Sequence, residues 1–155
     1  MTEPVAPGLE LLARVRADVG EPQTIGPTSA GLRRVVPILG GTVEGERLRG
    51  EVLPGGADWQ LVEPDGTGRL EARYIVRTDD GALVYVRNLG LRTGPAEALA
   101  RIADGEIVDP AEYYFRSIPG FECGDPRYEW LNRVLAVGSG ARLPGAVAID
   151  LYAVT

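Results

Sequence analysis

Hydrophobic and polar residues alternate along most of the chain, which is the period-two pattern of strands that bury one face. The first alternating run, LLARVRA, covers residues 11–17. Later runs of the same kind are RRVVPIL (33–39), RLRGEVL (47–53), LEARYIVRT (70–78), ALVYVRNLG (82–90) and AVAIDLYAV (146–154). Extended runs are also expected within residues 107–122 and 128–140. The pattern predicts an all-β protein.

Glycine and proline separate these runs, with 21 glycines and 12 prolines in the chain. Pro64-Asp65-Gly66 and Asp79-Asp80-Gly81 have the composition of tight turns in which glycine takes a positive φ. The two turns join residues 57–63, 70–78 and 82–90 into a three-stranded meander. We interpret the two adjacent aspartates as turn residues rather than as a catalytic carboxylate pair.

One segment has the composition of a helix instead. Residues 95–104 (PAEALARIAD) begin with proline, contain good helix formers and are followed by Gly105. About eight or more antiparallel strands with one short helix favour a single closed β-barrel with an interior pocket, because closure removes exposed strand edges. The last strand then pairs with the first. A β-sandwich is the alternative architecture.

Length and charge limit the class of protein. The 155 residues fit one domain spanning residues 1–155. The net charge of −6 argues against binding to nucleic acid or to an anionic membrane surface. Residues 1–19 lack the pattern of a signal peptide, and no segment approaches the roughly 20 apolar residues of a membrane helix. Together with a single cysteine, Cys123, these features predict a cytoplasmic protein.

All 16 basic residues are arginine, and histidine is absent. The sequence therefore cannot form a Ser–His–Asp triad, a Cys–His pair, a histidine metal site or a lysine Schiff base. It also lacks the GxxxxGK[ST], GxGxxG and calcium-loop motifs of phosphate, dinucleotide and calcium binding. We expect no cofactor and no metal. Carboxylate, guanidinium, phenol and amide groups remain as the catalytic side chains.

Charged and polar residues on the alternating runs are the first candidates for a site. Glu71 and Arg73 share one face of residues 70–78. Two interpretations stay open, since this pair either faces solvent or lies inside the barrel as a buried ion pair. Alternation also places Tyr114 and Arg116 on one face, where they offer a phenol and a cation.

The tryptophans are the second group of candidates. Trp59 and Trp130 either fill the core or form walls of a ligand pocket. In the second case Asp58, Gln60 or Asn132, which lie beside them in the sequence, orient a polar group of the ligand.

Three segments resemble the DUF3237 (UPF0311) family of small bacterial proteins. They are GGTVEGERLRGEVLPGGADWQLVEPDGTGRLEARYIVRTDDGALVYVRNLG, YYFRSIPGFE and YEWLNRVLAVG. The resemblance implies a single-domain antiparallel β-barrel with an interior cavity and, for most members, no assigned reaction. It implies motif positions at Asp58, Trp59, Glu71, Arg73, Tyr74, Asp80, Asn88, Arg116, Trp130 and Asn132. The family often has aspartate at the position of Glu71.

These observations favour a small-molecule-binding barrel that is a cofactor-independent enzyme acting on a small apolar or aromatic metabolite. Cyclisation, isomerisation, or addition and elimination beside a carbonyl needs a base, a partner for the oxyanion and exclusion of water. Glu71 is our first candidate for the base and Asp58 the second, because burial raises the pKa of a carboxyl. We expect Glu71→Gln to abolish turnover.

The other candidate residues receive supporting roles in this hypothesis. Arg73 is the third catalytic candidate, as an anchor for the carbonyl. The substrate-binding candidates are Trp59, Tyr74, Asn88, Tyr114, Arg116, Trp130 and Asn132. The helix at residues 95–104 would cover the mouth of the barrel. Two alternatives remain, namely a non-catalytic binding or carrier protein and an oligomeric scaffold without a cavity, and a homodimer is compatible with all of them.

Overall fold

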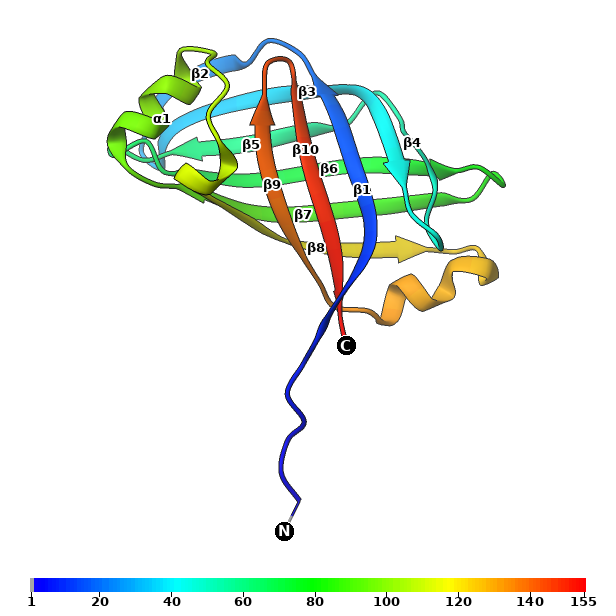
Figure 1. Cartoon of the computed structure of the whole chain (residues 1–155). Coiled ribbons are helices and arrows are strands. Elements are labelled where there is room, and N and C mark those ends of the chain that lie inside the picture. Colours follow the sequence, from blue (N-terminus) through cyan, green and yellow to red (C-terminus); the bar gives the residue numbers. More distant parts are fainter. Residues whose placement is uncertain (1) are drawn as a thin grey trace.

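The computed structural model describes residues 2–155, which form ten strands, one α-helix and two 3₁₀ helices (Figure 1). The strands are β1 (Leu9–Val19), β2 (Gln23–Thr28), β3 (Gly31–Glu44), β4 (Gly50–Val52), β5 (Ala57–Val62), β6 (Gly68–Thr78), β7 (Leu83–Thr93), β8 (Tyr114–Cys123), β9 (Ala136–Leu143) and β10 (Ala146–Val154). The helices are α1 (Ala96–Ala103), η1 (Pro110–Glu112) and η2 (Pro126–Arg133).

The strands close into an antiparallel barrel. Its neighbours in order are β1, β10, β9, β8, β7, β6 and β3, with β4 and β5 placed one after the other between β6 and β3. β1 completes the ring because it pairs with β10 on one side and with β3 on the other. β2 pairs with β3 outside the ring. The predicted barrel is confirmed, including the pairing of the first and last strands.

The predicted meander is formed by β5, β6 and β7, which pair in sequence. Gly66 and Gly81 in its two turns have φ values of 89° and 90°, in the left-handed region that favours glycine. In the second turn the hydroxyl of Thr78 accepts a hydrogen bond from the N–H of Ala82 and donates one to Asp80. Asp80 therefore stabilises the turn, as the sequence indicated.

Helix α1 coincides with the segment predicted to be helical, since it runs from Ala96 to Ala103 with Pro95 and Asp104 as its flanking cap residues. The interpretation of residues 128–140 as one extended run is wrong in its first half, which belongs to η2. Asp125 starts η2 because its carboxylate accepts a hydrogen bond from the N–H of Arg127. None of the helices in residues 2–155 is long and apolar enough to span a membrane.

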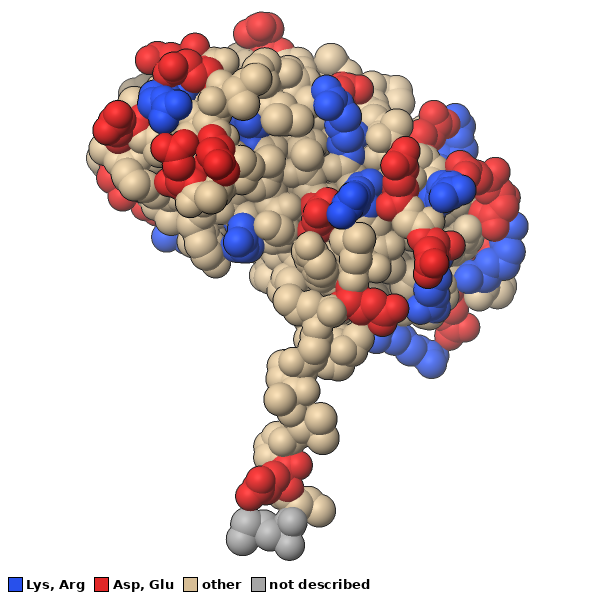
Figure 2. Space-filling model, in the orientation of Figure 1, with Lys and Arg blue, Asp and Glu red and all other residues tan. Residues whose placement is uncertain are grey.

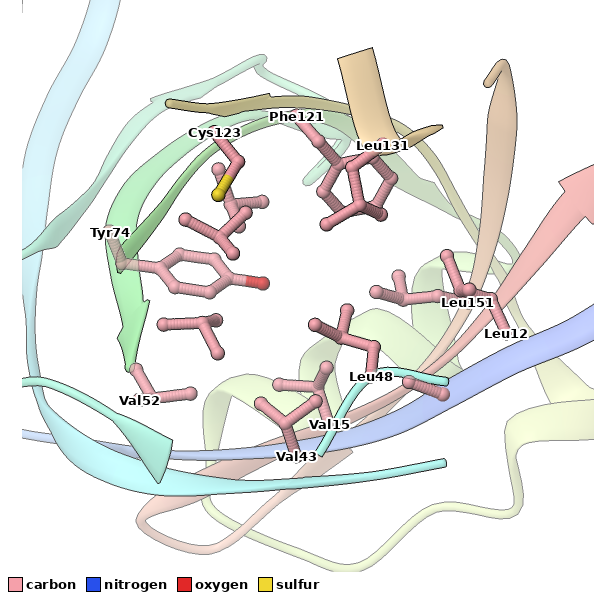
Figure 3. Close-up of a cluster of buried hydrophobic side chains, with 14 of the residues drawn as sticks. Leu12, Val15, Val43, Leu48, Val52, Tyr74, Phe121, Cys123, Leu131 and Leu151 are labelled. Atoms are coloured by element: carbon pink, nitrogen blue, oxygen red, sulfur yellow. The ribbon is translucent and has the colours of Figure 1, made fainter. Parts of the chain in front are cut away.

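Two clusters of buried apolar side chains fill the barrel. The larger cluster lies at the end near η2 and includes Val43, Leu48, Leu131 and Leu151 (Figure 3). The smaller cluster lies beneath α1 and consists of Leu70, Ala98, Val108, Tyr113 and Phe115. Members of both clusters line the same interior cavity, among them Val15 and Tyr74 of the larger cluster and Leu70 and Phe115 of the smaller one.

Candidate functional site

A cavity lies inside the barrel and is lined by members of both apolar clusters. Its apolar lining includes Val15, Ala17, Val36, Ile38, Leu70, Ala72, Phe115, Val147 and Ile149. Its polar lining consists of Arg34, Asp58, Gln60, Tyr74, Asn88, Arg92, Ser117 and Arg142. The cavity has a volume of about 70 Å³, more than a single water molecule needs. The lining reaches the exposed Pro22 after β1, where the cavity meets the surface.

The register of three strands places Asp58, Ala72 and Asn88 at one level of the barrel. Asp58 of β5 pairs with Ala72 of β6, and Ala72 pairs with Asn88 of β7. Directly paired residues point to the same face of a sheet, and all three line the cavity. Because Ala72 contributes only a methyl group, the carboxylate and the amide face a common free space.

A chain of hydrogen bonds holds the carboxylate of Asp58. Arg34 donates from Nε to Oε1 of Gln60 over 2.7 Å, and Gln60 donates from Nε2 to Oδ2 of Asp58 over 2.8 Å. Burial raises the pKa of Asp58 above its ordinary value, although hydrogen bonds from Gln60 and from the backbone of Glu71 and the charges of Arg92 and Arg34 oppose this shift. A carboxylate in this environment has the elevated pKa that suits a general base or acid.

Four buried polar side-chain atoms in residues 2–155 lack a hydrogen-bond partner, and all four belong to residues that line this cavity. They are Oδ1 of Asp58, Oδ1 of Asn88, Nε of Arg92 and Oγ of Ser117. Buried polar groups in folded proteins are nearly always hydrogen-bonded, and an unpaired one is costly. Their concentration around one space is what a binding site for a polar ligand group requires.

Two further arginines bring positive charge to the same cavity. Arg142 is held by its own hairpin, because its guanidinium donates to the carbonyl oxygens of Leu143 and Ala146. Arg92 lies close to the ring of Phe115, with 5.9 Å between the guanidinium carbon and the ring centre. Burial, followed by repulsion from Arg34, lowers the pKa of both Arg92 and Arg142.

Tyr74 extends from β6 into the barrel, with its hydroxyl directed to the middle of the larger apolar cluster (Figure 3). Its side chain also lines the cavity. Burial raises the pKa of this phenol, so Tyr74 stays protonated and able to donate a hydrogen bond.

Glu71 and Arg73 lie on the outer face of β6, so the prediction that they act inside the barrel is wrong. Oε1 of Glu71 lies 2.7 Å from Nη2 of Arg87 and 3.4 Å from Nη2 of Arg73. Strand alternation is the physical reason, because Leu70, Ala72 and Tyr74 occupy the inner face of the same strand. The two charged residues form a surface ion-pair network away from the cavity.

Trp59, Tyr114 and Arg116 also point outward, and none of them lines the cavity. Trp59 and Tyr114 are 45% and 49% exposed. The guanidinium carbon of Arg116 lies 5.6 Å from the centre of the Tyr114 ring, on the outer surface of β8. Their expected roles in substrate binding at the interior site are therefore not supported by their positions.

Trp130 and Asn132 belong to η2 and are also absent from the cavity lining. Trp130 packs against the larger apolar cluster, with the guanidinium carbon of Arg47 3.7 Å from its ring centre. Asn132 binds the backbone of Cys123 in both directions, because its Oδ1 accepts from the N–H and its Nδ2 donates to the carbonyl oxygen. Asn132 thereby attaches η2 to β8, and Trp130 attaches η2 to the larger apolar cluster, so both residues have a structural role.

Three of the ten candidate residues thus meet in the cavity, namely Asp58, Tyr74 and Asn88. The polar lining is completed by four residues that were not predicted from the sequence, namely Arg34, Arg92, Ser117 and Arg142. The sequence contains one indication that Arg92 belongs to the site. Arg92 lies four residues after Asn88 and therefore on the same face of its strand. Ser117 shares a face with Phe115, opposite to Tyr114 and Arg116.

Comparisons with known proteins agree with this architecture. The UPF0311 protein RPA1785 of Rhodopseudomonas palustris is 49% identical over 140 residues, covering 90% of this chain and 92% of the relative. The UPF0311 protein CA_C3321 of Clostridium acetobutylicum is 44% identical and covers 88% of this chain and 87% of its own length. The crystal structure of RPA1785 superimposes with a TM-score of 0.94 at 45% identity and covers 98% of this chain and all of that chain. A β-barrel-like protein from Acinetobacter baumannii gives 0.89 at 44% identity, with full coverage of both chains.

A more distant relative is named as an enzyme. The hydroalkoxylation enzyme phnH of Penicillium herquei is 25% identical over 142 residues, which cover 92% of this chain and 80% of phnH. The crystal structure of an enzyme from Penicillium herquei has a TM-score of 0.73 at 22% identity and covers all of this chain and 99% of that chain, a likeness of fold. The model of the family described as protein of unknown function (DUF3237) matches residues 7–154. The chain belongs to the DUF3237 family.

Proposed function

We propose that this protein is a cofactor-independent enzyme that moves a proton on a small, largely apolar or aromatic metabolite bound inside the barrel. The observation that carries this proposal is Asp58, a buried carboxyl with one oxygen unpaired beside the free space of the cavity. Burial raises its pKa above the ordinary value, which is the direction that favours a general base. Asp58 thereby takes the role that the sequence suggested for Glu71.

The reaction class that fits these groups is addition of a hydroxyl to a carbon–carbon double bond conjugated with a carbonyl. Oδ1 of Asp58 accepts the hydroxyl proton as the oxygen bonds to the β-carbon, and the electrons of the double bond pass to the carbonyl oxygen. Asp58 then returns the proton to the α-carbon as the carbonyl re-forms. One O–H bond and one π bond break, one C–O and one C–H bond form, and no cofactor is consumed.

Two side chains would donate hydrogen bonds to the oxyanion in this reaction, Asn88 through its Nδ2 amide and Ser117 through its hydroxyl. Asn88 lies at the level of Asp58 across the space left by Ala72. Ser117 has a buried hydroxyl without a partner and lines the same cavity. Hydrogen bonds that are already in place where charge develops lower the barrier most in a water-poor site. The apolar lining provides that environment.

The relationship with phnH supports the reaction class. That relative is named as a hydroalkoxylation enzyme, and hydroalkoxylation is the addition of an O–H group across a double bond. The identity of 25% extends over most of both chains. The same chemistry uses only the carboxylate, amide and hydroxyl groups that line the cavity of this protein.

The test is the ring closure of ortho-hydroxyphenyl propenyl ketone to a methylchromanone, followed by the loss of the enone absorbance. In heavy water the enzymatic product carries one deuterium on the α-carbon. Asp58→Asn should reduce turnover at least about 100-fold, within the range found for loss of a general base. Glu71→Gln is the matched control on the outer face and should keep the activity of the unchanged protein.

Two results would contradict parts of the proposal. Equal rates for Asp58→Asn and the unchanged protein would remove Asp58 from the mechanism. Tight binding of the ketone without acceleration of ring closure would favour the alternative of a non-catalytic binding or carrier protein.

A further inference from the structure

The charges inside the barrel are unequal. Arg34, Arg92 and Arg142 line the cavity, whereas Asp58 is the one carboxylate among its lining residues. Three guanidinium groups against one carboxylate leave an excess of two positive charges. Arg92 is buried and Arg34 and Arg142 are half-buried, and an excess of positive charge that is partly removed from water is costly unless an anion accompanies it.

No other carboxylate in the described residues compensates these three arginines. Nine arginines elsewhere in residues 2–155 lie within 4.0 Å of an aspartate or glutamate, including Arg87 beside Glu71. None of those ion pairs involves Arg34, Arg92 or Arg142. Most of the other arginines therefore have a carboxylate partner, whereas the three that line the cavity have none within 4.0 Å in the described part of the chain.

Arg92 is the clearest case. The residue is 7% exposed, and its Nε has no hydrogen-bond partner. A guanidinium carries five N–H donors, so burial without acceptors leaves a strong binding group unused. The fork of donors on arginine matches the two oxygens of a carboxylate.

The neighbouring arginines are held in place and keep donors free. Nε of Arg34 is fixed by Gln60, so its two terminal nitrogens remain available. One terminal nitrogen of Arg142 binds the carbonyl oxygens of its hairpin, so its other terminal nitrogen remains available. Head groups that are already positioned lose little conformational entropy when an anion binds.

From these observations we propose that the metabolite carries a carboxylate, which binds between Arg34, Arg92 and Arg142 while its apolar body extends toward Tyr74. The inference rests on the proposed function of the cavity and adds the chemical class of its substrate. Arg92 lies four residues beyond Asn88 on β7, roughly 13 Å along the strand. The side chains span part of this distance, because the charges of Arg92 and Arg34 both lower the pKa of Asp58 and Gln60 links Arg34 to Asp58. The bound carboxylate therefore lies near the reacting atoms and orients them.

The outer surface does not provide this preference for an anion. The net charge of the chain is −6, and acidic side chains gather over α1 and the segment that follows it (Figure 2). Exposed acidic residues there are Glu97, Asp104, Glu106, Asp109 and Glu112. Long-range attraction therefore does not favour an anion, and selectivity arises from the buried contacts, which salt screens only weakly.

The test compares cinnamate with its neutral analogue cinnamamide by isothermal titration calorimetry of the full chain. We expect cinnamate to bind at least about tenfold more tightly, a difference that buried arginine contacts readily supply. The shift of the Asn88 side-chain amide signal in NMR spectra reports that each probe occupies the cavity. Arg92→Gln should bring the two affinities close to parity, whereas Arg73→Gln on the outer face should keep the original ratio.

If Arg92→Gln does not fold, the ratio for the unchanged protein and for Arg142→Gln decides the question. Equal or tighter binding of cinnamamide inside the cavity overturns the carboxylate inference and leaves the proposed reaction intact. Failure of both probes to enter the cavity overturns the inference together with the proposed binding function. Equal turnover of Asp58→Asn and the unchanged protein, measured separately, contradicts the reaction without affecting the affinity ratio.

Discussion

Gln60 donates a hydrogen bond of 2.8 Å to Oδ2 of Asp58, and Oδ1 of the same carboxyl has no partner. One oxygen is thus fixed by the protein, and the other is available to a ligand. The hydrogen bond stabilises the charged form, so it lowers the pKa of Asp58 against the larger effect of burial.

Removal of this hydrogen bond should raise the pKa of Asp58 further. In Gln60→Leu the carboxylate keeps its burial but loses a donor, so its titration moves to higher pH. Carbon NMR titration of the Asp58 carboxyl measures the shift directly. Gln23→Leu, at an exposed position of β2, is the control and should leave the titration unchanged. A titration of Gln60→Leu at the original pH or below would show that Gln60 does not stabilise the charged form.

Asp58 should also make the stability of the protein depend on pH. Its pKa in the folded protein is raised above the ordinary value of 3.8, so the folded protein holds this proton more tightly than the unfolded chain does. The resulting stabilisation is fully present below pH 3.8 and is lost as the pH rises through the raised pKa. The Asp58→Asn variant has no carboxyl to titrate at this position, so it does not lose this stabilisation. The Tm of the variant minus the Tm of the unchanged protein should therefore increase as the pH rises from acidic to neutral.

Asp80 provides a control of opposite sign for this measurement. Hydrogen bonds from Thr78 and Tyr128 lower the pKa of Asp80, so its stabilisation is present above pH 3.8 and is lost as the pH falls through the lowered value. Asp80→Asn should therefore be less stable than the unchanged protein at neutral pH and approach it in acid. Parallel pH profiles for the two variants would contradict the opposite assignments.

Asn132→Ala should destabilise the protein without changing ligand affinity. The Asn132 side chain binds both the N–H and the carbonyl oxygen of Cys123. It thus makes the two backbone hydrogen bonds that a neighbouring strand would otherwise make with Cys123. Loss of these bonds should lower the free energy of unfolding by about 1–3 kcal/mol, measured by urea denaturation. A selective loss of cinnamate binding with unchanged stability would instead return Asn132 to the binding site.

Gly140→Ala should both destabilise the barrel and narrow the cavity. A Cβ at this position would lie 2.8 Å from carbon atoms of the Phe115 ring, and that ring lines the cavity. Overpacking of this kind costs about 1–3 kcal/mol, and a displaced ring should weaken ligand binding. Gly124→Ala is the matched control because no atom lies within 4 Å of its added Cβ. Equal stability of the two variants would contradict this account of Gly140.

The strands and their order were predictable because local chemistry specifies them. Turn glycines such as Gly66 and Gly81 mark the ends of strands, and alternation defines the two faces of each strand. Alternation does not say which face is inside when both faces mix apolar and polar residues. On β6 the charged residues Glu71 and Arg73 face solvent, as charge alone would suggest. On β7 the face that carries Asn88 and Arg92 turns inward.

The outer face of β8 shows why the site could not be located from the pattern. Tyr114 and Ile118 are 49% and 60% exposed, whereas Ser117 is buried on the opposite face. A barrel that holds a polar ligand contains polar residues and exposes some apolar ones, so the usual assignment of faces is reversed in part. Arg34 on β3 and Arg142 on β9 line the same cavity because the sheet closes into a barrel. The pattern within a single strand does not predict that these two residues meet. The contact of Asn132 with Cys123 likewise joins η2 to a strand, and the pattern within either segment does not predict it.

The register that aligns Asp58, Ala72 and Asn88 has a consequence for how this family can change during evolution. An insertion of one residue within a strand would exchange its inner and outer faces, so Glu71 would replace Ala72 inside the barrel. Such changes are therefore excluded from the strands that carry the site. New substrate preferences are expected to arise from single replacements at inward positions such as Ala72, with the backbone frame retained. Divergent members should accordingly conserve strand lengths more strictly than the identities of the side chains that line the interior.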